Sequence, residues 1–237
     1  MTADVTGLPI SLYARLAGLL YLLTNAAAIF AFSVSGSVIV RNDPAETAAN
    51  IAAGPAFRLG IGAELLAVVG TVALSVFLYL ILRRVNPGIA LLALAWRMIE
   101  NCVLVAITLP TFIALELIAT APYYANGDPQ LLQGLMYALL RVHQYGFQIG
   151  FLFLGLGSTA FSLLWLRSGY IPRIAAWWGL FASALMAIIA LGIVIWPKLY
   201  GIVTVAYMAP MGIFEIGLGL WLLFAGIRVT AEPESGI

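Results

Sequence analysis

Arg97 and Glu100 lie three residues apart in the stretch AWRMIENCVLV, residues 95–105, inside a long apolar run. Residues at this spacing share one face of a helix, so the two charges can form an ion pair. A guanidinium carries five N–H donors, and one carboxylate cannot satisfy them all in a dry environment. Glu215, at a similar depth in the last apolar segment, is the best further partner. We therefore expect Arg97, Glu100 and Glu215 to meet inside a bundle of helices.

This charged cluster has a functional and a structural interpretation. Each ionisable residue near the centre of a membrane costs about 2.5 to 3.5 kcal/mol, and such residues commonly serve function. An arginine that faces two buried carboxylates gives one acid a reason to bind a proton, because burial and a neighbouring like charge both favour the neutral acid. The functional interpretation is therefore a proton or substrate site. The structural interpretation is a clamp between the third and sixth apolar segments.

Three more polar residues lie nearer the outer ends of their segments. We expect Arg58, Glu64 and His143 to line the outer entrance to the cluster. His143 is the only histidine, and at the outer end of a helix a single histidine is more typical of a hydrogen-bonding or interfacial residue than of a catalyst. The outer entrance is thus predicted to be polar.

Glycines accompany these polar residues on two of the apolar segments. Gly212 and Gly219 share a helix face with Glu215, which fits either close helix packing or a cavity. In FLGLGST, Gly155 and Gly157 precede a serine that lacks the following glycine of a rhomboid protease, and they do not follow the GxGxxG order of a dinucleotide site. We interpret this second pair as packing residues.

Most membrane enzyme classes need residues that this chain does not have. One histidine cannot build a histidine-rich zinc site, a two-histidine di-iron site or a haem held by two histidines. We therefore predict no catalytic residue, no metal ligand and no cofactor. An enzyme that acts on a lipid, with glutamates and His143 as acid and base, stays open as an alternative.

The composition indicates a membrane protein. Of the 237 residues 63% are hydrophobic and only 9% are charged, which is outside the range of soluble domains. Six segments reach the ~20 apolar residues that cross a ~30 Å hydrocarbon core, and in lipid each must be a helix to satisfy its backbone. They are residues 10–34, 57–82, 88–110, 143–166, 174–195 and 202–227. We predict an all-α polytopic bundle of six transmembrane helices, a single domain over 1–237 with short flexible tails at 1–8 and 229–237.

Two connections between the spans are predicted to be structured. In RNDPAETAANIAAGP, Asp43 is a candidate N-cap, Pro44 stands at the first helical position and Glu46 completes a capping box, so a short surface helix is expected. Pro110 falls where the third span should leave the membrane core, and an amphipathic period precedes the fourth span. The third and fourth helices should therefore extend beyond the membrane as a hairpin with its tip at 126–129.

Charge placement predicts orientation and partners. One set of helix ends carries most of the basic residues, which by the positive-inside rule places both termini in the cytoplasm. These residues are Arg15, Arg83, Arg84, Arg167, Arg173 and Arg228. The formal net charge of +1 gives no basis for nucleic-acid binding, so membrane lipids are the expected partners.

Five stretches carry a resemblance to a known family. They are FRLGIGAEL at 57–65, WRMIENCVL at 96–104, HQYGFQIGFLFLGLGS at 143–158, RSGYIPRIAAW at 167–177 and EIGLGLWLLFAG at 215–226. In order and spacing they resemble the bacterial membrane-protein family catalogued as domain of unknown function 4386. The resemblance implies a bundle of six or seven helices in the bacterial cytoplasmic membrane and supplies no reaction. Matched residue by residue, its polar pattern points to Arg58, Glu64, Arg97, Glu100, His143 and Glu215.

The leading hypothesis is a membrane bundle that binds or transports a small or lipid-like molecule, with possible proton coupling. In this hypothesis Arg97 contacts an anionic group, while Glu100 and Glu215 orient Arg97 and carry a proton. A lipid-modifying enzyme and a structural or assembly subunit with a purely structural charge clamp are the two alternatives. The oligomeric state is not predicted.

Overall fold

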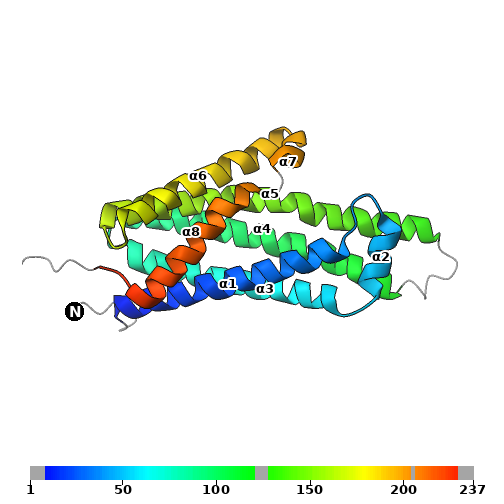
Figure 1. Cartoon of the computed structure of the whole chain (residues 1–237), viewed down its shortest axis with the longest axis horizontal. Helices are drawn as coiled ribbons and strands as arrows, with labels where there is room; N and C mark the ends of the chain where they lie inside the picture. The colour runs from blue at the N-terminus through cyan, green and yellow to red at the C-terminus, as the bar shows by residue number, and fades with distance from the viewer. Residues whose placement is uncertain (1–8, 121–127, 204–205, 229–237) are drawn as a thin grey trace, which may run out of the picture.

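The computed structural model describes residues 9–120, 128–203 and 206–228. Figure 1 shows an elongated bundle of helices, and the described residues contain no strand. The elements are α1 (Ile10–Val38), α2 (Pro44–Ala52), α3 (Ala56–Leu82), α4 (Pro87–Thr120), α5 (Pro129–Ser168), α6 (Arg173–Ile195), α7 (Lys198–Val203), the 3-10 turn η2 (Ala206–Met208), α8 (Ala209–Leu220) and the π-helical segment η3 (Trp221–Ala225). The all-α prediction is confirmed for this part of the chain.

Within residues 9–120, 128–203 and 206–228, six helical segments are long and apolar enough to cross a membrane, which confirms the predicted number of spans. They are Ile10–Val38, Ala56–Leu82, Pro87–Ala119, Pro129–Ser168, Arg173–Ile195 and Ala206–Ala225. Large apolar side chains cover their outer faces, as expected where lipid replaces water; Leu66 and Ile174, for example, are 71% and 82% exposed. The protein is a polytopic membrane bundle. The predicted tails, 1–8 and 229–237, lie outside the described residues.

Helices α4 and α5 are longer than the membrane requires. With 34 and 40 residues they reach about 50 and 60 Å at about 1.5 Å per residue, whereas the hydrocarbon core is ~30 Å thick. Pro110 lies inside α4 without ending it, as predicted. Of the expected tip at 126–129, only residues 128 and 129 are described. Both helices therefore continue past the core, in agreement with the predicted extension.

The short helix α2 packs against this extension. The side chain of Asp43 accepts a hydrogen bond from the backbone N–H of Glu46, so the predicted N-cap is confirmed. Thr47 and Ile51 of α2 are buried, and a separate apolar core holds this end of the bundle together. That core consists of Val38, Ile51, Phe57, Ile61, Ala114, Leu115, Met136 and Leu140.

Helices α1 and α8 cross closely near the end of the bundle where α1 begins. A Cβ atom on Gly18 would lie 2.7 Å from the carbonyl oxygen of Gly219, and one on Gly219 would lie 3.2 Å from that of Gly18. Small residues permit such an approach of two backbones in a membrane. Figure 1 shows α8 running obliquely across α1 and away from it toward α6 and α7. The two helices therefore touch at one end and separate toward the end that carries α2.

Candidate functional site

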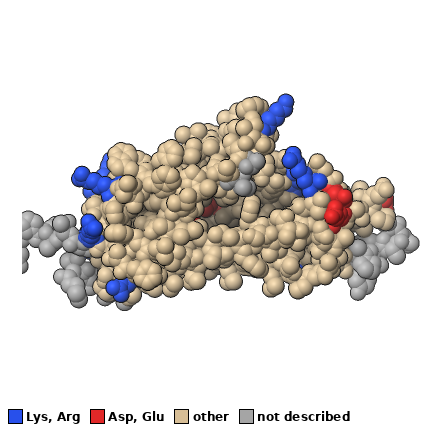
Figure 2. All heavy atoms as spheres, in the orientation of Figure 1, with Lys and Arg blue, Asp and Glu red and all other residues tan. Residues whose placement is uncertain are grey.

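A cavity of about 980 Å³ lies where α1 and α8 separate. Its walls come from α1, α3, α4, α5, α7, η2 and α8, with Met186 from α6. Figure 2 shows a hollow on the long side of the bundle, with acidic side-chain atoms visible inside it. On α5 the lining runs from the level of Tyr137 to that of Leu154, about 25 Å at about 1.5 Å per residue. The cavity is thus slightly deeper than one bilayer leaflet, whose hydrocarbon and headgroup layers together are about 20 Å thick.

The inner end of the cavity holds the predicted arginine and glutamate pair. Arg97 and Glu100 are both 4% exposed, and Arg97 Nη1 lies 2.8 Å from Glu100 Oε2. Neither of these two atoms makes a hydrogen bond of good geometry, so the attraction is chiefly electrostatic. Arg97 Nε donates to the hydroxyl of Ser75 on α3 at 3.4 Å, a long contact. Among the described residues, Arg97 Nη2 has no acceptor.

Glu215 lines the same cavity but does not contact Arg97 as the sequence predicted. Its Oε2 atom accepts a hydrogen bond of 3.1 Å from the amide of Asn25 on α1. That amide also donates to the backbone carbonyl of Tyr21. No ion pair within 4 Å joins Arg97 to Glu215 in the described structure. The predicted direct contact is wrong, because α8 packs on α1 and presents its carboxylate to that helix.

Gly157 of α5 makes room for the side chain of Arg97. A Cβ atom at this position would lie 2.9 Å from Arg97 Cγ and 3.1 Å from the carbonyl oxygen of Ala93. Gly155 packs in a similar way against the backbone of α6, where its Cβ would lie 2.6 Å from Ala187 N. Both glycines therefore serve packing, as predicted, and Gly157 additionally sets the path of the arginine.

Glu64 and His143 form a second polar group nearer the α2 end. His143 Nε2 lies 2.9 Å from Glu64 Oε1 and 3.0 Å from Oε2, and the hydroxyl of Thr108 lies 3.0 Å from Oε1. This group joins α3, α4 and α5 through side chains that are mostly buried. In the described part of the chain, no three histidine, cysteine, aspartate or glutamate side chains gather in a way that could hold a metal ion.

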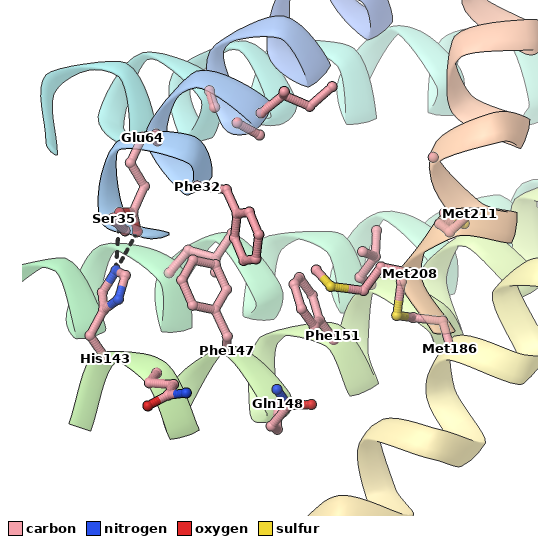
Figure 3. A pocket seen from close by; sticks show the side chains of 18 of the residues that line it. Phe32, Ser35, Glu64, His143, Phe147, Gln148, Phe151, Met186, Met208 and Met211 are labelled. Carbon is pink, nitrogen blue, oxygen red and sulfur yellow. Dashed lines mark hydrogen bonds and ion pairs between the residues drawn. The ribbon is translucent and has the colours of Figure 1, made fainter. Parts of the chain in front are cut away.

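Apolar side chains form the wall between the two polar groups. In Figure 3, Phe32 of α1 and Phe147 of α5 point toward one another, and Phe151 continues the aromatic wall inward. Met186, Met208 and Met211 lie on the opposite side of the same view. Methionine adapts to ligands of different shapes because its side chain is unbranched and polarisable. The wall therefore suits a flexible apolar chain or ring.

Three basic residues line the outer end of the cavity, which we call the rim. They are Arg41 after α1, Arg141 on α5 and Lys198 at the start of α7. Arg141 is held by Gln144 and Tyr145, through hydrogen bonds to the amide oxygen and to the phenol. No carboxylate lies within 4 Å of any of these three cations in the described structure. The rim is therefore positively charged.

Arg58 does not belong to this cavity, so its predicted place at the outer entrance is wrong. Its guanidinium pairs with Glu116 at 3.2 Å, and the two side chains are 52% and 43% exposed. The residue lies in the first turn of α3, on a face of that helix that turns away from the cavity. The other five predicted residues, Glu64, Arg97, Glu100, His143 and Glu215, all line the cavity.

Comparison with known proteins gives a family and no activity. The family described as Domain of unknown function (DUF4386) matches residues 16–226. The chain belongs to this family. A search of curated proteins found no match, and a search of solved structures found none.

In this DUF4386 protein, two cavity features were not predicted from the sequence. Asn25 holds Glu215, and Tyr207 donates to Gln148 at 2.7 Å. The one available signal for Asn25 was an amide in the middle of the first apolar span, where a polar side chain needs a partner. The two glycines on the face of Glu215 were predicted to serve either close helix packing or a cavity, and each role is found once. Gly219 packs against α1. Gly212 lines the cavity, and no atom lies within 4 Å of a Cβ added to it.

Proposed function

We propose that this protein binds and moves a small or lipid-like molecule that carries an anionic group, with Arg97 as its principal contact. The observation behind this proposal is the state of the Arg97 guanidinium. It is buried at the inner end of a large cavity, its buried Nη1 atom makes no hydrogen bond of good geometry, and its Nη2 atom has no acceptor among the described residues. A buried donor without a partner costs about 1 to 3 kcal/mol, which a bound carboxylate or phosphate oxygen would recover.

Glu100 and Glu215 take different parts in this proposal. Glu100 fixes one edge of the guanidinium through the pair at 2.8 Å. Glu215 has a neutral amide as its only described partner, so its charge is not balanced by a cation in contact. A carboxylate in that position can bind a proton while the anionic ligand occupies Arg97 and can release it when the ligand leaves. The transport would then be coupled to protons.

The geometry supports ligand binding over a charge clamp. A clamp between α4 and α8 needs a direct contact of Arg97 with Glu215, and that contact is absent from the described structure. The pair of Arg97 with Glu100 lies within one helix and holds no two helices together. Polar contacts between helices are made instead by Glu64 with His143 and Thr108, and by Glu215 with Asn25.

Native mass spectrometry of gently extracted protein tests the proposal. The wild type should retain an organic molecule that Arg97→Gln loses at least tenfold. Arg58→Gln is the matched control, because it removes the same charge from an exposed residue outside the cavity. The double variant Arg97→Gln/Glu100→Gln removes both members of the buried pair and so separates ligand loss from an unpaired buried charge.

Three outcomes of this experiment have distinct meanings. A wild-type protein that retains no molecule, or equal retention by Arg97→Gln and Arg58→Gln, would refute the proposed role of Arg97 in ligand binding. If Arg97→Gln does not fold, a double variant that folds but retains no molecule would still support ligand binding by Arg97. Chemical conversion of the retained molecule by the wild type but not by Glu215→Gln would indicate a lipid-modifying enzyme.

We propose further that the protein resides in the bacterial cytoplasmic membrane with both termini in the cytoplasm. At the end of the bundle where α1 begins, Figure 2 shows basic and no acidic side chains, whereas both kinds are visible at the other end; α1 and the last described helix both reach the basic end (Figure 1). Cytoplasmic loops of membrane proteins carry such an excess. Reporters fused to each terminus test the orientation: a reporter that is active only outside the cytoplasm should stay inactive at both ends.

A further inference from the structure

The cavity has a lateral opening between α1 and α8. Beyond the contact of Gly18 with Gly219, both helices present lining residues: Asn25, Ala28, Ile29 and Phe32 on α1, and Gly212 and Ile216 on α8. Three of these are large apolar residues that are also exposed, namely Ile29 at 56%, Phe32 at 55% and Ile216 at 38%. On a membrane-spanning helix, such residues face lipid. The edge of the opening is therefore in contact with the bilayer.

The hollow in Figure 2 lies on the long side of the bundle and not at its tip. Lipid tails can thus reach the cavity without crossing water. We call the gap bordered by Ala28, Ile29, Phe32, Gly212 and Ile216 the portal.

Charge favours a negative headgroup at the rim, and it does so at the inner end once Glu215 has bound the proton proposed above. The rim residues Arg41, Arg141 and Lys198 have no carboxylate within 4 Å, and at the inner end Arg97 keeps a free donor. The acids do not offset this preference at the rim, because Glu64 is paired with His143 and Glu100 with Arg97. A single anionic group could be held first at the rim and then by Arg97.

Resting on the function proposed above, we propose that the ligand is a membrane lipid with an anionic headgroup, which enters sideways through the portal. The headgroup passes from the rim to Arg97 inside the cavity, while the hydrocarbon chains stay along the wall of Phe32 and Phe147 and extend through the portal into the bilayer. The depth of the cavity, about one leaflet, matches this path from headgroup level to mid-bilayer. A soluble anion would need neither the portal nor the apolar wall.

Lipid competition in detergent micelles tests the headgroup. Purified protein is mixed with equal amounts of phosphatidylglycerol, which is anionic, and phosphatidylcholine, which is zwitterionic, and bound lipid is read by native mass spectrometry. The wild type should prefer phosphatidylglycerol. Arg41→Gln/Lys198→Gln removes two exposed rim charges and should reduce the preference about thirtyfold, since each basic residue at a membrane surface contributes about fivefold. Arg58→Gln removes one charge off the cavity and should keep the preference.

Ala28→Trp tests the portal. Ala28 lines the opening and is exposed, so an indole there should block the path of the chains and lower lipid retention at least tenfold. Ala26→Trp is the matched control, because Ala26 is an exposed residue of the same helix that does not line the cavity. Both variants add the same bulk to a lipid-exposed surface.

The outcomes separate this inference from the proposed function. Equal binding of the two lipids by the wild type, or equal retention by Ala28→Trp and Ala26→Trp, would overturn the lateral lipid route. If either of these results is found but the wild type retains a molecule that Arg97→Gln loses, the proposed binding function stands with a different ligand. If the wild type retains nothing, the proposed function itself fails.

Discussion

The side chain of Arg97 on α4 runs over Gly157 on α5, where a Cβ atom would lie 2.9 Å from Arg97 Cγ and 3.0 Å from Cδ. These carbons belong to the stem of the buried arginine, and the same Cβ atom would lie 3.1 Å from the carbonyl oxygen of Ala93. A methyl group at position 157 would therefore push the guanidinium out of its present place beside Glu100.

Gly157→Ala should lower ligand retention about tenfold while leaving Arg97 in the chain. A displacement of about 1 Å in a binding group is enough for a large loss, because the contact of a charged group depends on its position. Native mass spectrometry measures the retained molecule. Gly134→Ala is the control, since Gly134 lies in the same helix with open space at its Cβ. Equal retention by the two variants would show that the path over Gly157 does not matter.

Gly212→Leu should empty the cavity without unfolding the protein. Nothing lies within 4 Å of a Cβ at Gly212, and the residue lines the cavity, so a leucine there points into the space that a ligand would occupy. We expect at least a tenfold loss of bound molecule at an unchanged melting temperature. Gly217→Leu, on the same helix and equally open but outside the lining, should retain it. A loss in both variants would point to a general effect of leucine on α8.

Gly18→Ala should destabilise the contact of α1 with α8. Its Cβ would lie 2.5 Å from Leu223 N and 2.7 Å from Gly219 O, and backbone atoms cannot move aside as a flexible side chain can. Overpacking of this kind costs about 1 to 3 kcal/mol, and thermal unfolding in detergent should show a lower melting temperature. Gly62→Ala on α3 meets no atom within 4 Å and should be neutral or slightly stabilising. An unchanged melting temperature of Gly18→Ala would contradict the close crossing.

His143→Leu should cost about 1 to 3 kcal/mol of stability, because Glu64 then loses its contacts at 2.9 and 3.0 Å and keeps only the hydroxyl of Thr108. The double variant Glu64→Leu/His143→Leu removes the buried carboxylate as well and should recover part of the loss. A double-mutant cycle of melting temperatures measures the coupling. Additive losses would mean that the two residues do not depend on each other.

Several elements of this protein could be predicted from short stretches of sequence, because interactions between residues close together in the chain determine them. A run of about 20 apolar residues must be a helix in lipid, since its backbone has no other partner, and all six spans were predicted in this way. The cap of α2 depends on Asp43 and Glu46, which are neighbours in sequence. The pair of Arg97 with Glu100 follows from a spacing of three residues on one helix.

The tertiary structure alone decided how these helices are rotated and where they cross, and that determines which polar residues meet. Glu215 contacts Asn25, 190 residues away, because α8 packs on α1 through Gly18 and Gly219. Arg58 turns away from the cavity although Glu64, six residues later on α3, lines it. The sequence by itself thus determined the spans, the cap of α2 and the cost of the buried charges. Only packing between distant segments decided which charges share the cavity, because the rotation of a helix about its axis is set by the surfaces of its neighbours and not by its own hydrogen bonds.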